Sequence, residues 1–311
     1  MTSPASSDEP AILVTVVVPG VNTVDDMVRT LTALQGQSGV SLEVLLLDRT
    51  GEETRTAVRA RFPWVHVIAV PPSTTIPAMR AQAFHVARGQ YVAVIEDHVI
   101  VPPGWARDMV AAVERAKAES PGGAVVGGSV TNLATGRVVD WAAFLCEYSH
   151  CIAPMRGGTV AWLPGNNVVY PRQLLRAYLD RLSPDRWENH LHDLMKADGV
   201  RLVLHPEIVV GHEKYYTIGE YVSQRYLYAR SFAGARVQGS PRRRRVAFAL
   251  ASLALPPLLF ARTVLRIFRK RRHRIELGRS LPLIALFVVA WAAGELVGYG
   301  LGAGDSLEGV R

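Results

Sequence analysis

The sequence predicts an α/β protein built on a doubly wound, mostly parallel sheet and followed by a C-terminal membrane segment. Within the first 100 residues, four β-branched runs alternate with segments of helical spacing, which is typical of a sheet with helices on both faces. Two long apolar runs, flanked by arginines, follow after residue 240. The 311 residues are enough for one large domain with such an appendage.

The first third of the chain supplies strands and helices in regular order. Strands are expected at residues 11–18, 42–47, 65–70 and 91–95, and helices at residues 25–34, 52–61 and 77–88. The first two strands are almost unbroken apolar runs, as expected for parallel strands that are buried on both faces. Gly89 is expected to cap the C-terminal end of the third helix.

The following part of the chain is less regular. A helix is expected at residues 105–118, whereas residues 121–185 are richer in glycine and proline and include a loop at 163–167. Another helix is expected at residues 188–198. Two short strands, at residues 201–204 and 207–210, then lead to Gly211 and His212.

Polar side chains gather where the predicted strands end. Ligands of doubly wound sheets bind outside the carboxyl ends of the strands, so polar residues at these ends are candidates for a functional site. The candidates are Asp48, Glu96, Asp97, His98, Glu188 and His212. Carboxylate oxygens suit Mg²⁺ or Mn²⁺, and an imidazole among them shifts the preference towards Mn²⁺. Such an ion can neutralise the charge that develops on a diphosphate leaving group.

Several motifs are absent from the sequence. It contains no G-x-G-x-x-G and no G-x-x-x-x-G-K-[ST] motif, which argues against dinucleotide enzymes and P-loop NTPases. It contains no G-x-S-x-G motif either, which weakens the case for a hydrolase.

In this order and spacing, the motifs of the chain resemble those of the family-2 glycosyltransferases, which have the GT-A fold. The resemblance covers roughly residues 12–236. It is carried by Val-Val-Val-Pro at 16–19, Asp48, Pro-Ala-Met-Arg at 77–80, Glu-Asp-His at 96–98, Val-Pro-Pro-Gly-Trp at 101–105, Pro-Gly-Asn-Asn at 164–167, Trp-Glu-Asn at 187–189 and Gly-His at 211–212.

The resemblance implies that the chain binds a nucleotide-diphosphate sugar. Asp48 would read the nucleotide base, and Arg80 would lie near the nucleotide. Pro19, at the end of the opening motif, would border the same ligand. Glu96 stands where the family has the first acid of its Asp-x-Asp motif, near the ribose and the metal, and Asp97 would share this place.

The resemblance also implies a divalent cation, either Mn²⁺ or Mg²⁺. His98 occupies the place of the second acid of the motif, which is usually a metal ligand, and His212 matches a further ligand of the family. Glu96 and Asp97 would complete the set. A histidine in place of an aspartate is a departure from the family, and it favours Mn²⁺ over Mg²⁺.

The base that activates the acceptor normally lies in a Glu-Asp pair at the start of a helix. Here the pair is Glu188-Asn189, and an amide accepts no proton at neutral pH. Glu188 is therefore the expected catalytic carboxylate, with Asp193 on the same helix as the second candidate. The other interpretation of Glu188 is an acid that interacts with the helix dipole.

The Gln-x-x-Arg-Trp motif of processive members is absent, which favours a non-processive enzyme. The arginines between residues 221 and 236 are expected on a solvated basic helix face; the alternatives are contact with the diphosphate or with the membrane surface.

The tail carries the positive charge of the chain. Residues 241–311 have a formal charge of +9 and residues 1–240 a charge of −1, which indicates a membrane segment and argues against a nucleic-acid partner. No signal peptide precedes residues 1–240, so this catalytic domain is expected on the cytoplasmic face of the plasma (inner) membrane.

Within the tail, residues 281–303 are long enough to span a bilayer as a transmembrane helix. Residues 246–261 are shorter and contain Pro256-Pro257, which would break a straight helix, so a re-entrant or interfacial segment is expected, with a second span as the alternative. The basic linker at 262–279 would then stay on the cytoplasmic face, by the positive-inside rule, and Arg311 would lie outside.

The leading hypothesis is metal-assisted transfer of a sugar, with inversion, from a nucleotide diphosphate to a lipid-linked or cell-envelope glycan acceptor. The alternatives are transfer to polyprenyl phosphate and a degenerate, non-catalytic membrane scaffold with the same fold.

Overall fold

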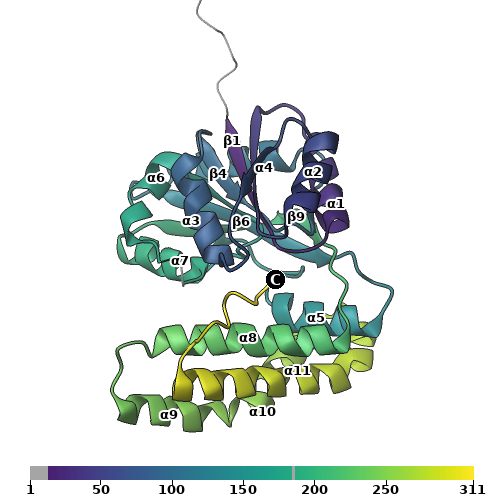
Figure 1. Cartoon of the computed structure of the whole chain (residues 1–311), viewed down its shortest axis with the longest axis vertical. Coiled ribbons are helices and arrows are strands. Elements are labelled where there is room, and N and C mark those ends of the chain that lie inside the picture. Colours follow the sequence, from purple (N-terminus) through teal and green to yellow (C-terminus); the bar gives the residue numbers. More distant parts are fainter. Residues whose placement is uncertain (1–12, 184–185) are drawn as a thin grey trace, which may run out of the picture.

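The computed structural model describes residues 13–183 and 186–311, which form an α/β layer and a helical layer that lie against each other (Figure 1). The α/β layer is organised around a nine-stranded sheet. Its first strands are β1 (Val14–Gly20), β2 (Leu42–Asp48), β3 (His66–Ala69) and β4 (Tyr91–Val94). They pair in parallel in the order β3-β2-β1-β4, so the α/β class predicted for this part is confirmed.

The helices that cover these strands are α1 (Val24–Gln35), α2 (Glu52–Arg61), α3 (Ile76–Val86) and α4 (Trp105–Ala118). The prediction that Gly89 caps α3 is wrong, because the helix ends at Val86 and Ala87 is its C-cap. Gly89 meets a different requirement. A Cβ atom at this position would lie 2.4 Å from the backbone nitrogen of Thr15, so only glycine allows the chain to pass this close to β1.

The second half of the sheet is mixed. It contains β5 (Val99–Ile100), β6 (Ala124–Asn132), β7 (Gly158–Thr159), β8 (Val168–Pro171) and β9 (Arg201–His212). Strand β8 lies antiparallel between β4 and β6, and β9 pairs in parallel with β6. The two short strands predicted around residues 201–210 are one strand, because a bulge in the β6–β9 pairing after Gly128 absorbs the irregular residues around Pro206.

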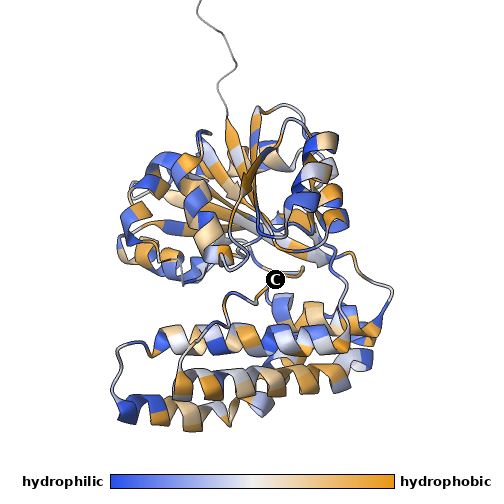
Figure 2. Ribbon diagram, in the orientation of Figure 1, coloured by the Kyte–Doolittle hydropathy of each residue, from blue (hydrophilic) through white to orange (hydrophobic). Residues whose placement is uncertain are grey.

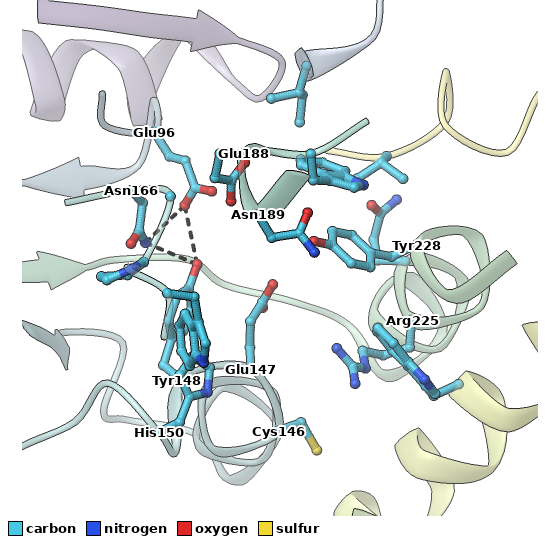
Figure 3. A pocket seen from close by; sticks show the side chains of 18 of the residues that line it. Glu96, Cys146, Glu147, Tyr148, His150, Asn166, Glu188, Asn189, Arg225 and Tyr228 are labelled. Atoms are coloured by element: carbon cyan, nitrogen blue, oxygen red, sulfur yellow. Dashed lines mark hydrogen bonds between the residues drawn. The ribbon is translucent and has the colours of Figure 1, made fainter. Parts of the chain in front are cut away.

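Three short elements complete the α/β layer. They are α6 (Arg172–Arg176), the 3₁₀ helix η1 (Leu179–Arg181) and α7 (Glu188–Ala197). Helix α7 begins at Glu188, as predicted, and directs its first turn towards the space between the two layers (Figure 3).

The helical layer consists of α5 (Val138–Tyr148), α8 (Ile218–Arg236), α9 (Arg242–Ser252), α10 (Leu255–Lys270) and α11 (Arg274–Leu301). Helices α8 and α11 run along each other (Figure 1). A Cβ atom at Gly294 of α11 would lie 2.3 Å from the carbonyl oxygen of Tyr226, so glycine lets the two helices approach closely. Tyr221 of α8 and Phe287 of α11 pack edge to face inside the same core as α5.

The outward side of this layer is apolar in part. Figure 2 shows hydrophobic colour along much of α11 and hydrophilic colour at the start of α9, where four arginines lie. The exposed large apolar residues of the layer include Leu250, Leu253, Leu258, Leu265, Phe268, Ile275 and Val289. Within the described residues, α11 is the one helix that is long and apolar enough to cross a membrane by itself.

Helices α9 and α10 meet at an angle of 53°, and only together are they long enough to cross a membrane. Pro256 lies in the first turn of α10, where a missing N–H costs nothing. The predicted break in residues 246–261 is therefore confirmed.

The segment after α11 returns to the α/β layer. The guanidinium of Arg49, at the end of β2, donates hydrogen bonds to the carbonyl oxygens of Glu308, at 2.9 Å, and of Val310. The backbone N–H of Arg311 donates to Gln224 at 2.8 Å. Arg311 therefore lies on the same side of α11 as the sheet, which differs from the predicted topology with Arg311 across the membrane.

Candidate active site

A cavity of about 560 Å³ lies between the two layers (Figure 3). Its lining comes from the ends of β1 and β4, from α5, α7 and α8, and from the facing sides of α10 and α11. Pro19, Arg80, Glu96, Asp97 and His98 all line it, so the structure brings these predicted residues together at one site.

Asp97 organises the end of the cavity near β1. Its carboxylate accepts hydrogen bonds from the backbone N–H groups of Val21, at 2.7 Å, and Asn22, at 2.8 Å. It also contacts Nδ1 of His98 at 3.0 Å. Burial opposes ionisation, but the hydrogen bonds from His98, Asn22 and Val21 hold the pKa of Asp97 below its ordinary value. The geometry therefore places Asp97 behind His98, where it fixes the tautomer and orientation of the ring.

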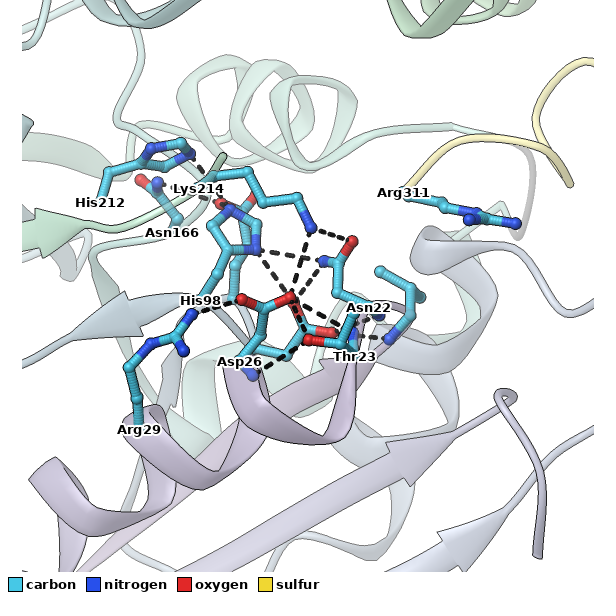
Figure 4. Close-up of polar contacts among 12 residues, drawn as sticks. Asn22, Thr23, Asp26, Arg29, His98, Asn166, His212, Lys214 and Arg311 are labelled. Atoms are coloured by element: carbon cyan, nitrogen blue, oxygen red, sulfur yellow. Dashed lines mark hydrogen bonds and ion pairs between the residues drawn. The ribbon is translucent and has the colours of Figure 1, made fainter. Parts of the chain in front are cut away.

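His98 and His212 face each other across the sheet edge. Their Nε2 atoms lie 3.1 Å apart, and Nε2 of His98 lies 3.4 Å from the Glu96 carboxylate. Figure 4 shows His98 between His212 on one side and Asn22 on the other. One ligand atom from each of Glu96, His98 and His212 fits within 4.8 Å, a spacing that suits one divalent ion. Asp97 does not belong to this trio.

The protonation of the two imidazoles is set by their surroundings. Burial and the neighbouring His98 lower the pKa of His212 well below its ordinary value, so its ring is neutral and able to coordinate an ion. Burial by itself would lower the pKa of His98, but the hydrogen bond to Asp97 and the charge of Glu96 raise it. The carboxylate of Glu96 and the two imidazoles together form a donor set that can hold one divalent cation.

Glu96 is held from two other directions. Asn166 donates a hydrogen bond to it at 3.2 Å, and the hydroxyl of Tyr148 donates another at 3.3 Å. Asn166 belongs to the Pro-Gly-Asn-Asn loop recognised in the sequence. The guanidinium of Arg80 lies 3.8 Å from the Glu96 carboxylate.

Arg80 and Glu188 form a close ion pair at the centre of the site. The Arg80 side chain is 5% exposed and the Glu188 side chain 21%. Burial opposes the charge on Arg80, but Glu188 and Glu96 outweigh this effect and raise its pKa. Gly165 makes room for the pair, since a Cβ atom there would lie 2.0 Å from the Glu188 carboxylate.

Asn189 and Asp193, which follow Glu188 on α7, take no part in the ion pair with Arg80. Asn189 lines the cavity beside Glu188, as expected for the family's base position. Asp193 also borders the cavity, but its side chain is 68% exposed and pairs with Lys196 at 2.8 Å. It therefore points its charge towards solvent.

Asp48 lies outside the cavity lining. Its side chain is fully buried, and its two oxygens accept hydrogen bonds from Thr50, from the backbone of Gly51 at 3.3 Å and from Arg55 at 3.0 Å. In this arrangement Asp48 holds the loop after β2, and the described geometry leaves it no free acceptor for a nucleotide base.

Several lining residues were not predicted from the sequence. Glu147 and Tyr148 come from the end of α5, Arg225 from α8, and Trp291 from α11. The prediction of a solvated basic face is wrong for Arg225, because this residue is half-buried and its guanidinium lies 4.1 Å from the Trp291 ring centre. The pattern Gln224-Arg225 was visible in the sequence, but only the packing of α8 on α11 shows which way Arg225 points.

The family described as glycosyl transferase family 2 matches residues 15–176, which is just over half of the chain. Among curated protein sequences no relative matches.

Solved structures show the fold. Residues 1–349 of S. aureus TarS, in complex with UDP-GlcNAc, share 14% identity with the chain at a TM-score of 0.51, and the match covers 91% of this chain and 93% of that one. The mannosyltransferase PcManGT from Pyrobaculum calidifontis, in complex with GDP-Man and Mn²⁺, shares 20% identity at a TM-score of 0.54, over 91% of this chain and 86% of that one. At these identities the likeness establishes the common GT-A fold.

Proposed function

Because the chain belongs to glycosyl transferase family 2, we propose that it transfers a sugar from a nucleoside diphosphate to a lipid-linked or cell-envelope glycan acceptor. The observation that supports this proposal is the continuity of one cavity. It runs from the strand-end cluster around Asp97 and His98 to the facing sides of α10 and α11. A donor at the first end and a lipid-borne acceptor at the second would therefore meet beside Glu188 and Glu147.

At the donor end, the chain offers several groups that suit a diphosphate. Arg80 and Arg311 line the cavity and supply positive charge. Glu96, His98 and His212 would hold the divalent ion, which when bound would neutralise the charge that develops on the leaving diphosphate. Asp97 would keep His98 in the tautomer that presents Nε2 to that ion.

At the acceptor end, the cavity is lined by both cationic and apolar side chains. Arg225, Arg262 and Arg266 line the cavity together with Leu259 and Trp291. Guanidinium groups bind phosphate oxygens, and the apolar residues suit a hydrocarbon chain. This combination favours an acceptor that carries a phosphate or diphosphate next to a lipid tail. Because the family's base position holds Asn189, a polyprenyl phosphate, whose oxygen is already ionised, is the second candidate acceptor.

The helical layer supports a membrane location. Its outward side combines exposed apolar residues with arginines of α9 and α10, as in helices that lie in the interface of anionic membranes. Since the segment after α11 returns to Arg49, we propose that α11 lies along the cytoplasmic face of the plasma membrane and does not cross it. The cavity would then open close to the headgroups.

The proposal can be tested with the full chain bound to anionic vesicles that contain a total bacterial lipid extract. Radiolabelled UDP-GlcNAc or GDP-mannose is added with Mn²⁺, and label in the lipid fraction is measured. We expect transfer from at least one donor. A double variant, Arg262→Gln with Arg266→Gln, should transfer at least ~10-fold less, about 1.4 kcal/mol of lost stabilisation, while it still binds the donor.

The matched control is Arg269→Gln. Arg269 is exposed on the same helix and does not border the cavity among the described lining residues, so this variant should transfer normally. Equal transfer by the double variant and the control would refute the acceptor assignment. Failure of the wild-type chain to bind or turn over any nucleotide sugar would refute the proposed function itself.

A further inference from the structure

The carboxylates predicted as the base are both engaged elsewhere. Glu188 forms a close ion pair with the buried Arg80, so its carboxylate is already occupied. Asp193 is exposed and paired with Lys196. Asn189, in the family's position, cannot accept a proton. An acceptor hydroxyl in the cavity therefore needs a different base.

Glu147 occupies a suitable place. It is the penultimate residue of α5, half-buried, and lines the cavity. Figure 3 shows its carboxylate pointing into the cavity, towards the side where Glu188 and Asn189 lie. The hydrogen bond from α5 to Glu96 is made by Tyr148, so Glu147 is separate from the metal-binding trio. Throughout residues 13–183 and 186–311, the Glu147 carboxylate has no hydrogen bond and no ion pair.

Arg225 of α8 lines the same cavity as Glu147 and also has an unpartnered polar atom. Its guanidinium lies against the Trp291 ring, and its buried Nε atom has no hydrogen-bond partner among the described residues. Two charged groups of opposite sign thus face one cavity without forming a direct pair. Buried polar groups are normally satisfied, so this arrangement indicates that a polar ligand lies between them.

From this geometry we propose that Glu147 is the general base that deprotonates the acceptor hydroxyl, an inference that rests on the proposed sugar transfer. The hydroxyl oxygen forms a bond to the anomeric carbon of the donor sugar, while the bond from that carbon to the diphosphate oxygen breaks. The leaving nucleoside diphosphate takes the bonding electron pair. The hydroxyl proton moves to the Glu147 carboxylate, which later returns it to water.

The electrostatic environment is suited to this role. Burial raises the pKa of Glu147 to about 7; Arg225 opposes the shift, Glu96 adds to it, and His98 opposes it. Arg262 and Arg266 of α10 line the same cavity and add positive charge. A base whose pKa lies near the working pH combines a substantial ionised fraction with good proton affinity, which is the most effective compromise.

The test is Glu147→Gln in the full, vesicle-bound chain, which removes basicity but keeps size. Turnover is followed as release of UDP from UDP-GlcNAc or of GDP from GDP-mannose with the lipid extract present. We expect kcat to fall roughly 10²- to 10⁴-fold, with donor affinity within about twofold of wild type. The wild-type rate should rise with pH through about 7, and this acid limb should be absent in the variant. The matched control is Glu53→Gln, an exposed glutamate on α2.

The outcomes separate the two proposals. Glu147→Gln with at least half of the wild-type kcat would overturn the base assignment while sugar transfer stands, and it is the result expected if the acceptor is a polyprenyl phosphate. A variant that loses turnover but keeps the acid limb of the pH profile would also overturn it, since Glu147 would then act only on structure. A wild-type chain that releases no nucleotide from any donor would overturn both proposals.

Discussion

Gly165→Ala tests the reasoning about the centre of the site. An alanine Cβ at this position would lie 2.0 Å from Oε1 and 2.3 Å from Cδ of Glu188, whereas real Cβ atoms stay beyond 3.0 Å. The carboxylate must therefore move by at least about 1 Å, which separates it from Arg80. The three atoms nearest to that Cβ all belong to the Glu188 side chain, and the backbone at Gly165 is not in the left-handed region that favours glycine.

The energetic cost follows from the burial of the pair. Loss of one partner of a buried ion pair typically costs 3–5 kcal/mol. Here Glu188 is displaced and not removed, its side chain is 21% exposed, and Arg80 keeps Glu96 at 3.8 Å. We therefore expect a smaller loss of about 1–3 kcal/mol, or a fall in Tm of roughly 2–6 °C. Turnover should fall about 10-fold, since a shift of 1 Å in a positioned group is costly.

The assay is a double-mutant cycle of Gly165→Ala and Glu188→Ala, with Tm and nucleotide release as readouts. If the methyl group acts only through the Glu188 side chain, the double variant should be no worse than Glu188→Ala by itself. The control is Gly136→Ala, since a Cβ atom at Gly136 meets no atom within 4 Å. Additive losses, or a Gly165→Ala chain that behaves like the control, would refute the account.

Three further predictions follow from the site. His98→Ala and His212→Ala should each lower Mn²⁺-dependent turnover at least ~10-fold and weaken Mn²⁺ binding, measured by calorimetry; binding as tight as wild type would contradict the metal trio. Glu147→Gln should raise Tm at pH 8 but not at pH 4.5. In the folded chain the pKa of Glu147 is raised from 4.5 to about 7. Ionisation of Glu147 therefore lowers the free energy of unfolding progressively as the pH rises from 4.5 to about 7, and the full loss is present above pH 7. Burial raises the pKa of Cys146 to about 12, so iodoacetamide at pH 8 should leave this thiol unmodified in the folded chain, as checked by mass spectrometry.

The sequence predicted that several strand-end residues share one site, and the structure brings them to one cavity, because strand ends are encoded locally. Asp97 and His98 directly follow a buried apolar run, and any parallel sheet brings such residues to one edge. His212 is 114 residues away in the sequence, but it also ends a strand, and the structure places it 3.1 Å from His98. Asp48 ended a strand in the same way, yet local hydrogen bonds with Thr50 and Arg55 turn it away from the cavity.

The helical side of the cavity could not be predicted because its residues come from helices. Glu147 sits in a mostly apolar helix, and Arg225 sits among aromatic residues, so neither stands in a recognisable motif. Which face of α5 or α8 borders the cavity depends on how both pack against α11. Strands β6 and β8 were missed for a related reason. Their partner strands lie far along the chain. The two glycines of β6 lower its strand propensity in the sequence, although in the structure they allow neighbouring segments to pack closely.

The return of the last described segment to Arg49 has a consequence for the timing of biosynthesis. Residues 302–311 leave the ribosome about 210 residues after β4, which at 5–20 residues per second is roughly 10–40 s later. Strands β1–β4 can pair during that interval, but the cavity keeps an open wall until α10 and α11 have docked and Val310 has reached Arg49. Newly made chains should therefore acquire their sheet early and a closed cavity late, after the last helices have docked.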